Sequence, residues 1–304
     1  MDHYDEKIRS YYRIMKAGGQ EYAVITDADK KLNEVAIPVE IGGYPVQAIG
    51  KKAFLGCKGL RYVRLPETVT TIGEWAFAFC DSLNRIEIPR AGISFGKGVF
   101  KNDAKLNEIV VYDPGRQSVD TQGSSAAMVS KLMAAAPVIM DAEYLLDAEH
   151  SGEAEWLHKW DTRLEHILSL KDDEGYHLYV LCGEEDLHFD YEEYLEYNRE
   201  KKSSLCMLRL INDIALNDED KVSLKDYIKE HTAGCESEAA IRVLLKRHGD
   251  DRDYYRMMLD IGAVHEGNLE AVLFLMGDRH AQMKAFLMEE CRKVTKDYFD
   301  DLLL

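Results

Sequence analysis

The chain has 304 residues, of which 46% are hydrophobic and 31% are charged, and its formal net charge at pH 7 is −17. This length is sufficient for two domains with separate cores. No apolar run reaches the roughly 18 residues of a membrane helix, and the first residues lack the apolar segment of a secretory signal. We therefore expect a cytoplasmic protein that does not bind membranes, with a secreted or cell-surface protein whose signal was removed as the alternative.

The charge is distributed unevenly along the chain. Residues 1–116 contain 17 Lys and Arg and 15 Asp and Glu, a net charge of +2, whereas the remainder contains 21 and 40, a net charge of −19. A charge step at one point predicts a domain boundary there. Because the acidic half would repel phosphate groups, we expect no nucleic acid partner.

The first segment, residues 1–19, places its larger apolar side chains at helical spacing. These residues are Tyr4, Ile8, Tyr11, Tyr12 and Met15. The spacing predicts an amphipathic helix. Since a stack of repeats follows and the ends of such a stack need covering, we expect this helix to cap the N-terminal end.

Residues 20–116 are dominated by a 23-residue period. Leucines recur at Leu60, Leu83 and Leu106, and each begins the pattern L-x-x-V/I-x-L/I, which Pro66 and Pro89 complete in the first two. Several residue types that share one period predict a solenoid. Apolar residues at the fourth and sixth positions predict one short strand per unit, and proline then ends the strand because it cannot donate to a ladder.

Other columns with the same period predict details of the core. Phe54, Phe77 and Phe100 should stack as an aromatic column, and Cys57 and Cys80 should lie near each other as buried free thiols, with a disulfide as the less favoured alternative. Glycines recur where the backbone is expected to need a positive φ. These are Gly50, Gly73 and Gly96.

This pattern resembles the BspA-like class of bacterial leucine-rich repeats over about residues 20–112. The stretch IPVEIGGYPVQAIGKKAF (Ile37–Phe54) is similar to the opening repeat of that class. The resemblance implies stacked coils with a parallel β-face and a role in binding. Some relatives are secreted adhesins, but this chain differs from them in its few repeats, its missing signal and its long helical extension, so adhesion is not carried over.

The strand pattern also predicts which side chains point away from the core. Three columns should face outward, namely Asn33, Arg61, Asn84, Asn107; Glu34, Tyr62, Arg85, Glu108; and Ala36, Arg64, Glu87, Val110. Their centre holds our candidate binding residues, Arg61, Tyr62, Arg64, Arg85 and Glu87, because Arg and Tyr are enriched at interface hot spots. The partner would be another protein or the acidic half of the same chain. An ordinary solvated sheet face remains the alternative.

Residues 117–304 are expected to form an acidic, all-helical domain of helical hairpins. Asp190 and Asn217 are expected N-caps, an apolar stripe with Trp156 and Trp160 predicts a helix after Ser151, and two closing helices are expected near 269–276 and 281–299. Ala263–Met276 weakly resembles the helix pair of an ankyrin repeat. The segment Tyr176–Cys182 is ambiguous between helix and strand.

Motifs for chemistry are missing from the sequence. No zinc-ligand spacing, phosphate-binding loop or nucleophile elbow occurs, so we predict no metal, no cofactor and no catalytic residues. Cys182 as a nucleophile, a cation at Gly183–Asp186 and a ligand pocket lined by Trp156 and Trp160 are weaker alternatives.

The sequence thus predicts an α+β protein in three parts, a capping helix at 1–19, a short leucine-rich-repeat solenoid with a parallel β-face at 20–116, and an all-α domain at 117–304. We expect a protein-interaction or scaffold module and no enzyme. An enzyme or ligand-binding helical domain that the repeats target, or a trimmed cell-surface adhesin, is the alternative.

Overall fold

The computed structural model of the protein describes residues 2–115, 125–177 and 190–302. It divides into two compact units, an N-terminal unit, Met1–Glu165, and a C-terminal unit, His166–Leu304. The division differs from the expected boundary after residue 116. Helix α1 (Ser125–Val138) packs against strand β11 (Glu108–Tyr112), so the first helices fold together with the repeats.

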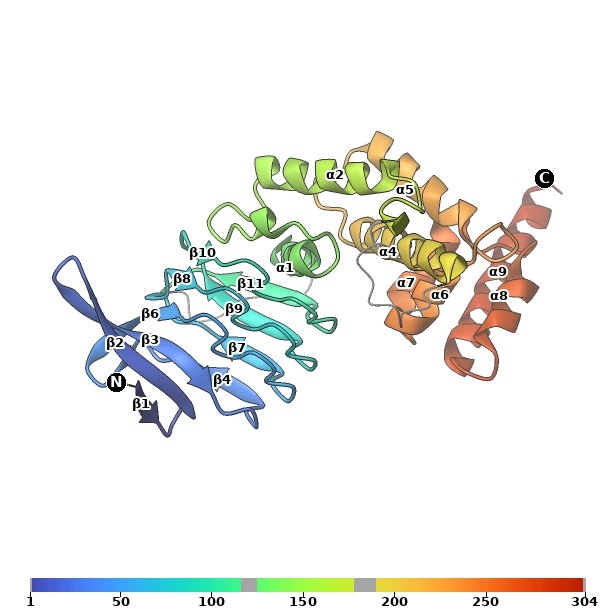
Figure 1. Ribbon diagram of the computed structural model, residues 1–304. Coiled ribbons are helices and arrows are strands. Elements are labelled where there is room, and N and C mark those ends of the chain that lie inside the picture. Colours follow the sequence, from blue (N-terminus) through green and yellow to red (C-terminus); the bar gives the residue numbers. More distant parts are fainter. Residues whose placement is uncertain (1, 116–124, 178–189, 303–304) are drawn as a thin grey trace. The chain divides into compact units, whose positions relative to one another are not determined.

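Parallel strands from successive repeats lie side by side in the N-terminal unit (Figure 1). One sheet has the order β11-β9-β7-β4, formed by β4 (Glu34–Ala36), β7 (Tyr62–Arg64), β9 (Arg85–Pro89) and β11. The other sheet includes β3 (Gln20–Ala28), β6 (Tyr44–Ile49), β8 (Thr71–Ile72) and β10 (Ser94–Phe95), and the short β5 (Glu40–Ile41) pairs with β6. The predicted solenoid with a parallel β-face is confirmed.

The prediction of a helix over residues 1–19 is wrong. Strands β1 (Asp2–Asp5) and β2 (Ser10–Ala17) pair in antiparallel fashion and continue to β3. Gly18 and Gly19, both with positive φ, make the turn between β2 and β3, and the tyrosines favour extended structure. The apparent helical stripe was no buried face, because Tyr4, Tyr11 and Met15 are exposed.

The aromatic column lies in the core as predicted. The ring centroids of Phe54 and Phe77 are 5.0 Å apart, and those of Phe77 and Phe100 are 5.8 Å apart, with nearly parallel planes in both pairs. All three side chains are buried. Each ring therefore stacks on the ring of the adjacent repeat and stabilises the contact between the two repeats.

The cysteine column is also buried, and both Cys57 and Cys80 are free thiols. Burial raises the pKa of the Cys57 thiol to about 11 and that of Cys80 further. One repeat later the column continues with Asp103, which is fully buried and whose Oδ1 accepts a hydrogen bond from the Cys80 N–H at 2.8 Å. Burial raises the pKa of this carboxyl to about 8, so Asp103 is largely protonated at neutral pH.

The reason predicted for the repeated glycines is wrong. Gly50, Gly73 and Gly96 do not have positive φ; instead, Lys52, Trp75 and Gly98, two residues later, do. A Cβ at Gly73 would lie 2.5 Å from the Lys51 N and 2.7 Å from the Gly50 carbonyl carbon. Glycine is required at this column because the backbones of adjacent repeats approach too closely for a side chain.

Helices cover the C-terminal end of the repeat stack, as expected for the start of the helical region. The Gly98 N–H donates to the Glu143 carboxylate in η1 (Glu143–Leu145) at 2.6 Å. Trp156 and Trp160, on α2 (Ala154–Ser169), donate their Nε1–H groups to the carbonyls of Leu145 and Leu132 at 3.0 and 2.9 Å. Both tryptophans are buried, so they belong to the core.

The described residues of the C-terminal unit form helices joined by turns and loops. Its elements are α4 (Tyr191–Ile211), α5 (Asp218–Glu230), α6 (Ala239–Val243), the π-helical turn η2 (Leu244–His248), α7 (Arg252–Asp260), α8 (Leu269–Met276) and α9 (Ala281–Leu302). Asp190 and Asn217 are N-caps as predicted, accepting from the N–H groups of Glu192 and Asp220. The ambiguous segment after His177 lies outside the described residues.

Candidate functional site

The five candidate residues lie where the repeat pattern placed them along the strands. Tyr62 is paired with Arg85, and Arg64 is paired with Glu87, in the parallel register of β7 and β9. Arg61 precedes β7, and its N–H donates to the Asn33 carbonyl at 2.6 Å. The 23-residue columns therefore run across the sheet as expected.

Glu87 is the centre of a charged network on this sheet. Its carboxylate accepts hydrogen bonds from Arg64 Nη1 at 2.5 Å and from Arg85 Nη2 at 2.8 Å. Arg85 also donates from Nη1 to Glu108 at 3.0 Å. Because Glu87 is only 6% exposed, its two arginine partners are needed to compensate for its loss of hydration.

An aromatic ring also contacts this network, and a second tyrosine lies beside it on β7. The Arg64 guanidinium lies over the Tyr112 ring, 4.4 Å from its centroid, and the Tyr112 hydroxyl donates to the Leu65 carbonyl at 2.7 Å. Burial, with the nearby Glu87 carboxylate, raises the pKa of Tyr62. Tyr62 thus stays a neutral phenol, and Arg64 is fixed in orientation.

The exposed part of this face is narrower than the sequence pattern indicated. Val110 was expected to point outward, but it is 2% exposed because α1 packs on β11. Glu87 is likewise buried. Arg61 is exposed, and Tyr62, Arg64 and Arg85 are half-buried. We call the exposed portions of these four residues the arginine face; it lies on the β7–β9 part of the sheet.

Ion pairs between successive repeats were missed by the sequence reasoning. Five pairs join residues that are 23 apart, and in each pair the base belongs to the earlier repeat: Lys51–Glu74, Lys58–Asp81, Arg64–Glu87, Arg85–Glu108 and Arg90–Asp113. The sequence contained the signal for these ion pairs, because the 23-residue period can be applied to charged residues as well as to apolar ones.

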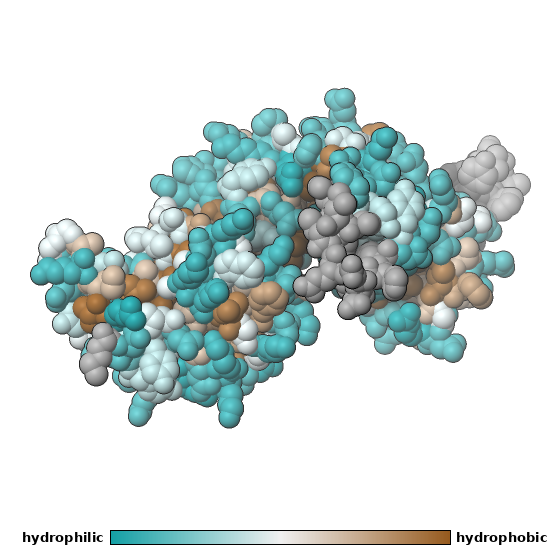
Figure 2. All heavy atoms as spheres, viewed as in Figure 1, coloured by the Kyte–Doolittle hydropathy of each residue, from teal (hydrophilic) through white to brown (hydrophobic). Residues whose placement is uncertain are grey.

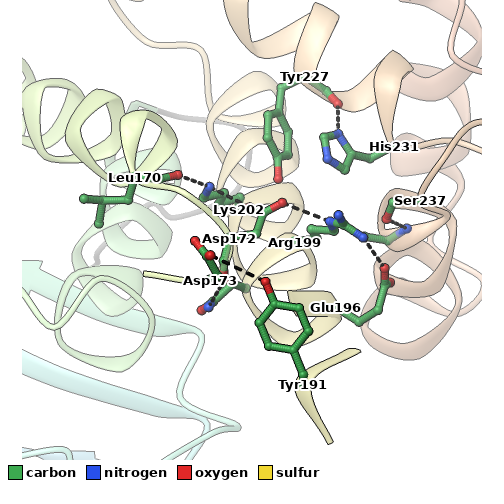
Figure 3. A network of polar contacts seen from close by, with 12 residues as sticks. Leu170, Asp172, Asp173, Tyr191, Glu196, Arg199, Lys202, Tyr227, His231 and Ser237 are labelled. Atoms are coloured by element: carbon green, nitrogen blue, oxygen red, sulfur yellow. Dashed lines mark hydrogen bonds and ion pairs between the residues drawn. The ribbon is translucent and has the colours of Figure 1, made fainter. Parts of the chain in front are cut away.

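The C-terminal unit contains a different polar network, shown in Figure 3. Asp172 accepts from Lys202 at 2.8 Å and from Arg199 at 2.9 Å, and Lys202 also donates to the Leu170 carbonyl at 2.6 Å. Burial raises the pKa of Asp172, but the hydrogen bonds from Lys202 and Arg199 outweigh burial and leave the pKa below its ordinary value. Each of these charged side chains has a partner of opposite charge, so we interpret the network as stabilising the fold.

A metal site in the described ranges would need several His, Cys, Asp or Glu side chains close together. There, no group of three or more His, Cys, Asp or Glu side chains could hold a metal ion. The weaker candidates Cys182 and Gly183–Asp186 lie outside the described residues. Within those ranges, none of the helices combines the length and the apolar character needed to cross a membrane.

Comparisons with known proteins agree with the repeat pattern. A model of the BspA type leucine rich repeat region matches residues 28–127 with six copies. The structure of the T. pallidum leucine rich repeat protein shares 32% identity over 35% of this chain and 48% of that chain, with a TM-score of 0.31.

Two further solved structures are similar over a comparable share of the chain. A leucine rich cell surface protein from Faecalibacterium prausnitzii A2-165 shares 28% identity over 37% of this chain and 32% of its own length, with a TM-score of 0.30. A leucine-rich repeat protein from Bacteroides capillosus shares 25% identity over 36% of this chain and 96% of its own length, with a TM-score of 0.27.

The chain spans less than half of the length of the first two of these proteins. No curated protein matches it. The periodic columns, the stacked parallel strands and the family match converge on one conclusion: residues 28–127 are a BspA-type leucine-rich repeat region, followed by a helical extension.

Proposed function

We propose that the arginine face binds a protein partner through an acidic segment of that partner, and that the protein acts as a non-catalytic interaction or scaffold module. Leucine-rich repeat proteins generally serve such roles, and the family match supports the coarse assignment. The observation that carries the finer proposal is the Glu87 network, which fixes Arg64 and Arg85 before any partner arrives.

Preformed side chains lower the cost of binding. An arginine on an open surface loses rotamer freedom when it is immobilised, whereas Arg64 is already held by Glu87 and Tyr112. The Arg64 side chain is 43% exposed, so part of it remains accessible to a partner. A fixed guanidinium fork is suited to bidentate recognition of carboxylates.

The local charge favours an acidic partner. Arg61, Arg64 and Arg85 belong to a part of the sheet with two paired carboxylates, those of buried Glu87 and of Glu108. The centre of the face therefore carries an excess of positive charge, although the chain as a whole is acidic. Association should weaken as salt concentration rises, because such steering is screened.

A cytoplasmic location is part of this proposal, and the cell surface is the alternative. The F. prausnitzii protein is described as a cell surface protein. Protease treatment of intact cells distinguishes the two: an intracellular protein survives until the cells are lysed, whereas a surface protein is digested at once.

The test uses the full chain as bait in native extract of the source cells, with retained proteins identified by mass spectrometry. We compare the wild type with a double variant, Arg61→Glu with Tyr62→Ala, which leaves both arginine partners of Glu87, Arg64 and Arg85, in place. Lys97→Glu is the matched control, since Lys97 is an exposed base that follows β10 on the other sheet.

The proposal expects a protein with an acidic segment to be retained by the wild type and the Lys97→Glu control and lost from the double variant. Retention of the same proteins by all three baits would discard the arginine face. Arg85 is left unchanged because its replacement would remove a partner of buried Glu87 and damage the fold.

A further inference from the structure

Helix α8 is apolar apart from Glu270, yet most of its side chains are at least partly exposed. Its sequence is LEAVLFLM, and of its eight residues only Val272 and Met276 are buried. Phe274 is 84% exposed, and Figure 2 shows hydrophobic residues gathered at the surface over α8. A helix that is hydrophobic all round is normally covered on both sides, and the end of a helical stack normally has a polar outer surface.

The neighbouring helix α9 has a groove on its outward side. The groove has a volume of about 450 Å³ and is lined by Ala285, Met288, Glu289, Arg292 and Lys293. The opposite side of α9 packs through Phe286 and Leu287, both buried. A protruding aromatic ring and a groove lined by both apolar and charged side chains are therefore presented by the two helices of one hairpin.

The two features do not fill each other within one chain. Phe274 stays 84% exposed although α8 packs on α9. Two copies related by a two-fold axis can satisfy both features at once, because each supplies a ring and a groove. We infer that α8 and α9 form a homodimer surface in which Phe274 of each copy occupies the α9 groove of the other.

Charge complementarity supports a second copy as the occupant. Glu270, one turn before Phe274, and Arg292, in the groove, are both exposed. The same combination already occurs inside the chain: Arg256 lies 4.8 Å from the Phe286 ring centroid and pairs with Glu290 at 2.6 Å. In the dimer, Arg292 takes the place of Arg256, with Phe274 and Glu270 supplied by the second copy.

The experiment measures the molar mass of the full chain by sedimentation velocity over two orders of magnitude in protein concentration. The wild type should rise from 34.7 kDa to twice that mass. Phe274→Glu should raise the dissociation constant roughly tenfold or more. Val222→Glu is the matched control, because Val222 is a 56% exposed apolar residue on α5, and it should dimerise like the wild type.

Charge reversal tests the pairing independently of the aromatic ring. Glu270→Arg alone and Arg292→Glu alone should each weaken the dimer, and the two together should restore it. Circular dichroism checks that every variant is folded. A wild type that stays monomeric at all concentrations overturns the inference, as does equal behaviour of Phe274→Glu and Val222→Glu, or a double reversal that fails to restore the dimer.

Discussion

The two units stabilise their buried polar groups in different ways. In the repeat region, contacts recur with the period, so the Cys80 N–H and its acceptor Asp103 are 23 residues apart, as are Arg64 and Glu87. In the C-terminal unit buried charges are paired individually, without a period, as in Lys202 with Asp172 or Arg209 with the Asn212 carbonyl. A repeat residue can thus be interpreted from its column, whereas a helical residue cannot.

The largest effect should come from breaking the aromatic column at its centre. Phe77→Ala removes a buried ring that stacks on both neighbours, and we expect a loss of about 3–5 kcal/mol in the free energy of unfolding. Urea denaturation of the full chain, followed through the unfolding transition of the N-terminal unit, measures this loss. Phe100→Ala, which loses one of these two stacking contacts, should cost less; a larger loss there would contradict the column.

The glycine column should be almost as sensitive. Gly73→Ala places a Cβ 2.5 Å from a backbone atom of the preceding repeat, and we expect a loss of about 3 kcal/mol because that backbone cannot move aside. Gly92→Ala is the control, since its Cβ would meet only the tip of Glu149 at 3.4 Å. Similar melting temperatures for the two variants would show that close approach does not set the glycine requirement.

The helical unit should be most sensitive at its paired charges. Lys202→Met leaves Asp172 with Arg199 as its remaining cationic partner, and we expect a loss of about 2 kcal/mol, below the roughly 3–5 kcal/mol for a buried charge left with none. Chemical denaturation gives the value. The exposed pair Lys229–Asp226 on α5 is the control, and Lys229→Met there should change stability by less than about 0.5 kcal/mol.

The smallest expected effect is a contrast in pH dependence. The pKa of Asp103 is raised to about 8, so its contribution to stability is complete below about pH 4 and is lost as pH rises toward 8. The pKa of Asp172 is lowered, so its contribution is present above about pH 4 and is lost as the pH falls.

Asp103→Asn should therefore gain stability relative to the wild type as the pH rises from 5 to 8, and the stability deficit of Asp172→Asn should disappear in acid. Melting temperatures of the two variants across pH 3–9 supply the measurement. If both variants followed the wild-type pH profile in parallel, neither carboxyl would titrate as its surroundings require.

The period made most of the repeat region predictable. The columns placed Phe77, Cys80 and the register of Arg64 with Glu87 correctly, because one displacement relates every unit to the next. Prediction from the period failed at the two ends of the repeat array, where the 23-residue repeat no longer continues. The Tyr-rich segment before the first repeat forms strands β1 and β2, and Val110 is buried under α1.

The helical elements were predictable from caps and apolar runs, but their tertiary roles were not. The bounds of α8 matched the expected 269–276, yet no sequence rule indicated that Phe274 would be left open. The ankyrin-like resemblance stays a prediction, as does the use of the arginine face by a partner.

The direction of the ion pairs between repeats has an evolutionary consequence. Repeats of equal length invite loss or gain of a unit by unequal recombination. Removing one 23-residue unit here would set Lys51 against Lys97 in place of Glu74, two like charges across one step of the stack. In this column the base-then-acid order makes the existing neighbours better matched than the rearranged ones, so its charges disfavour loss of the unit that carries Glu74.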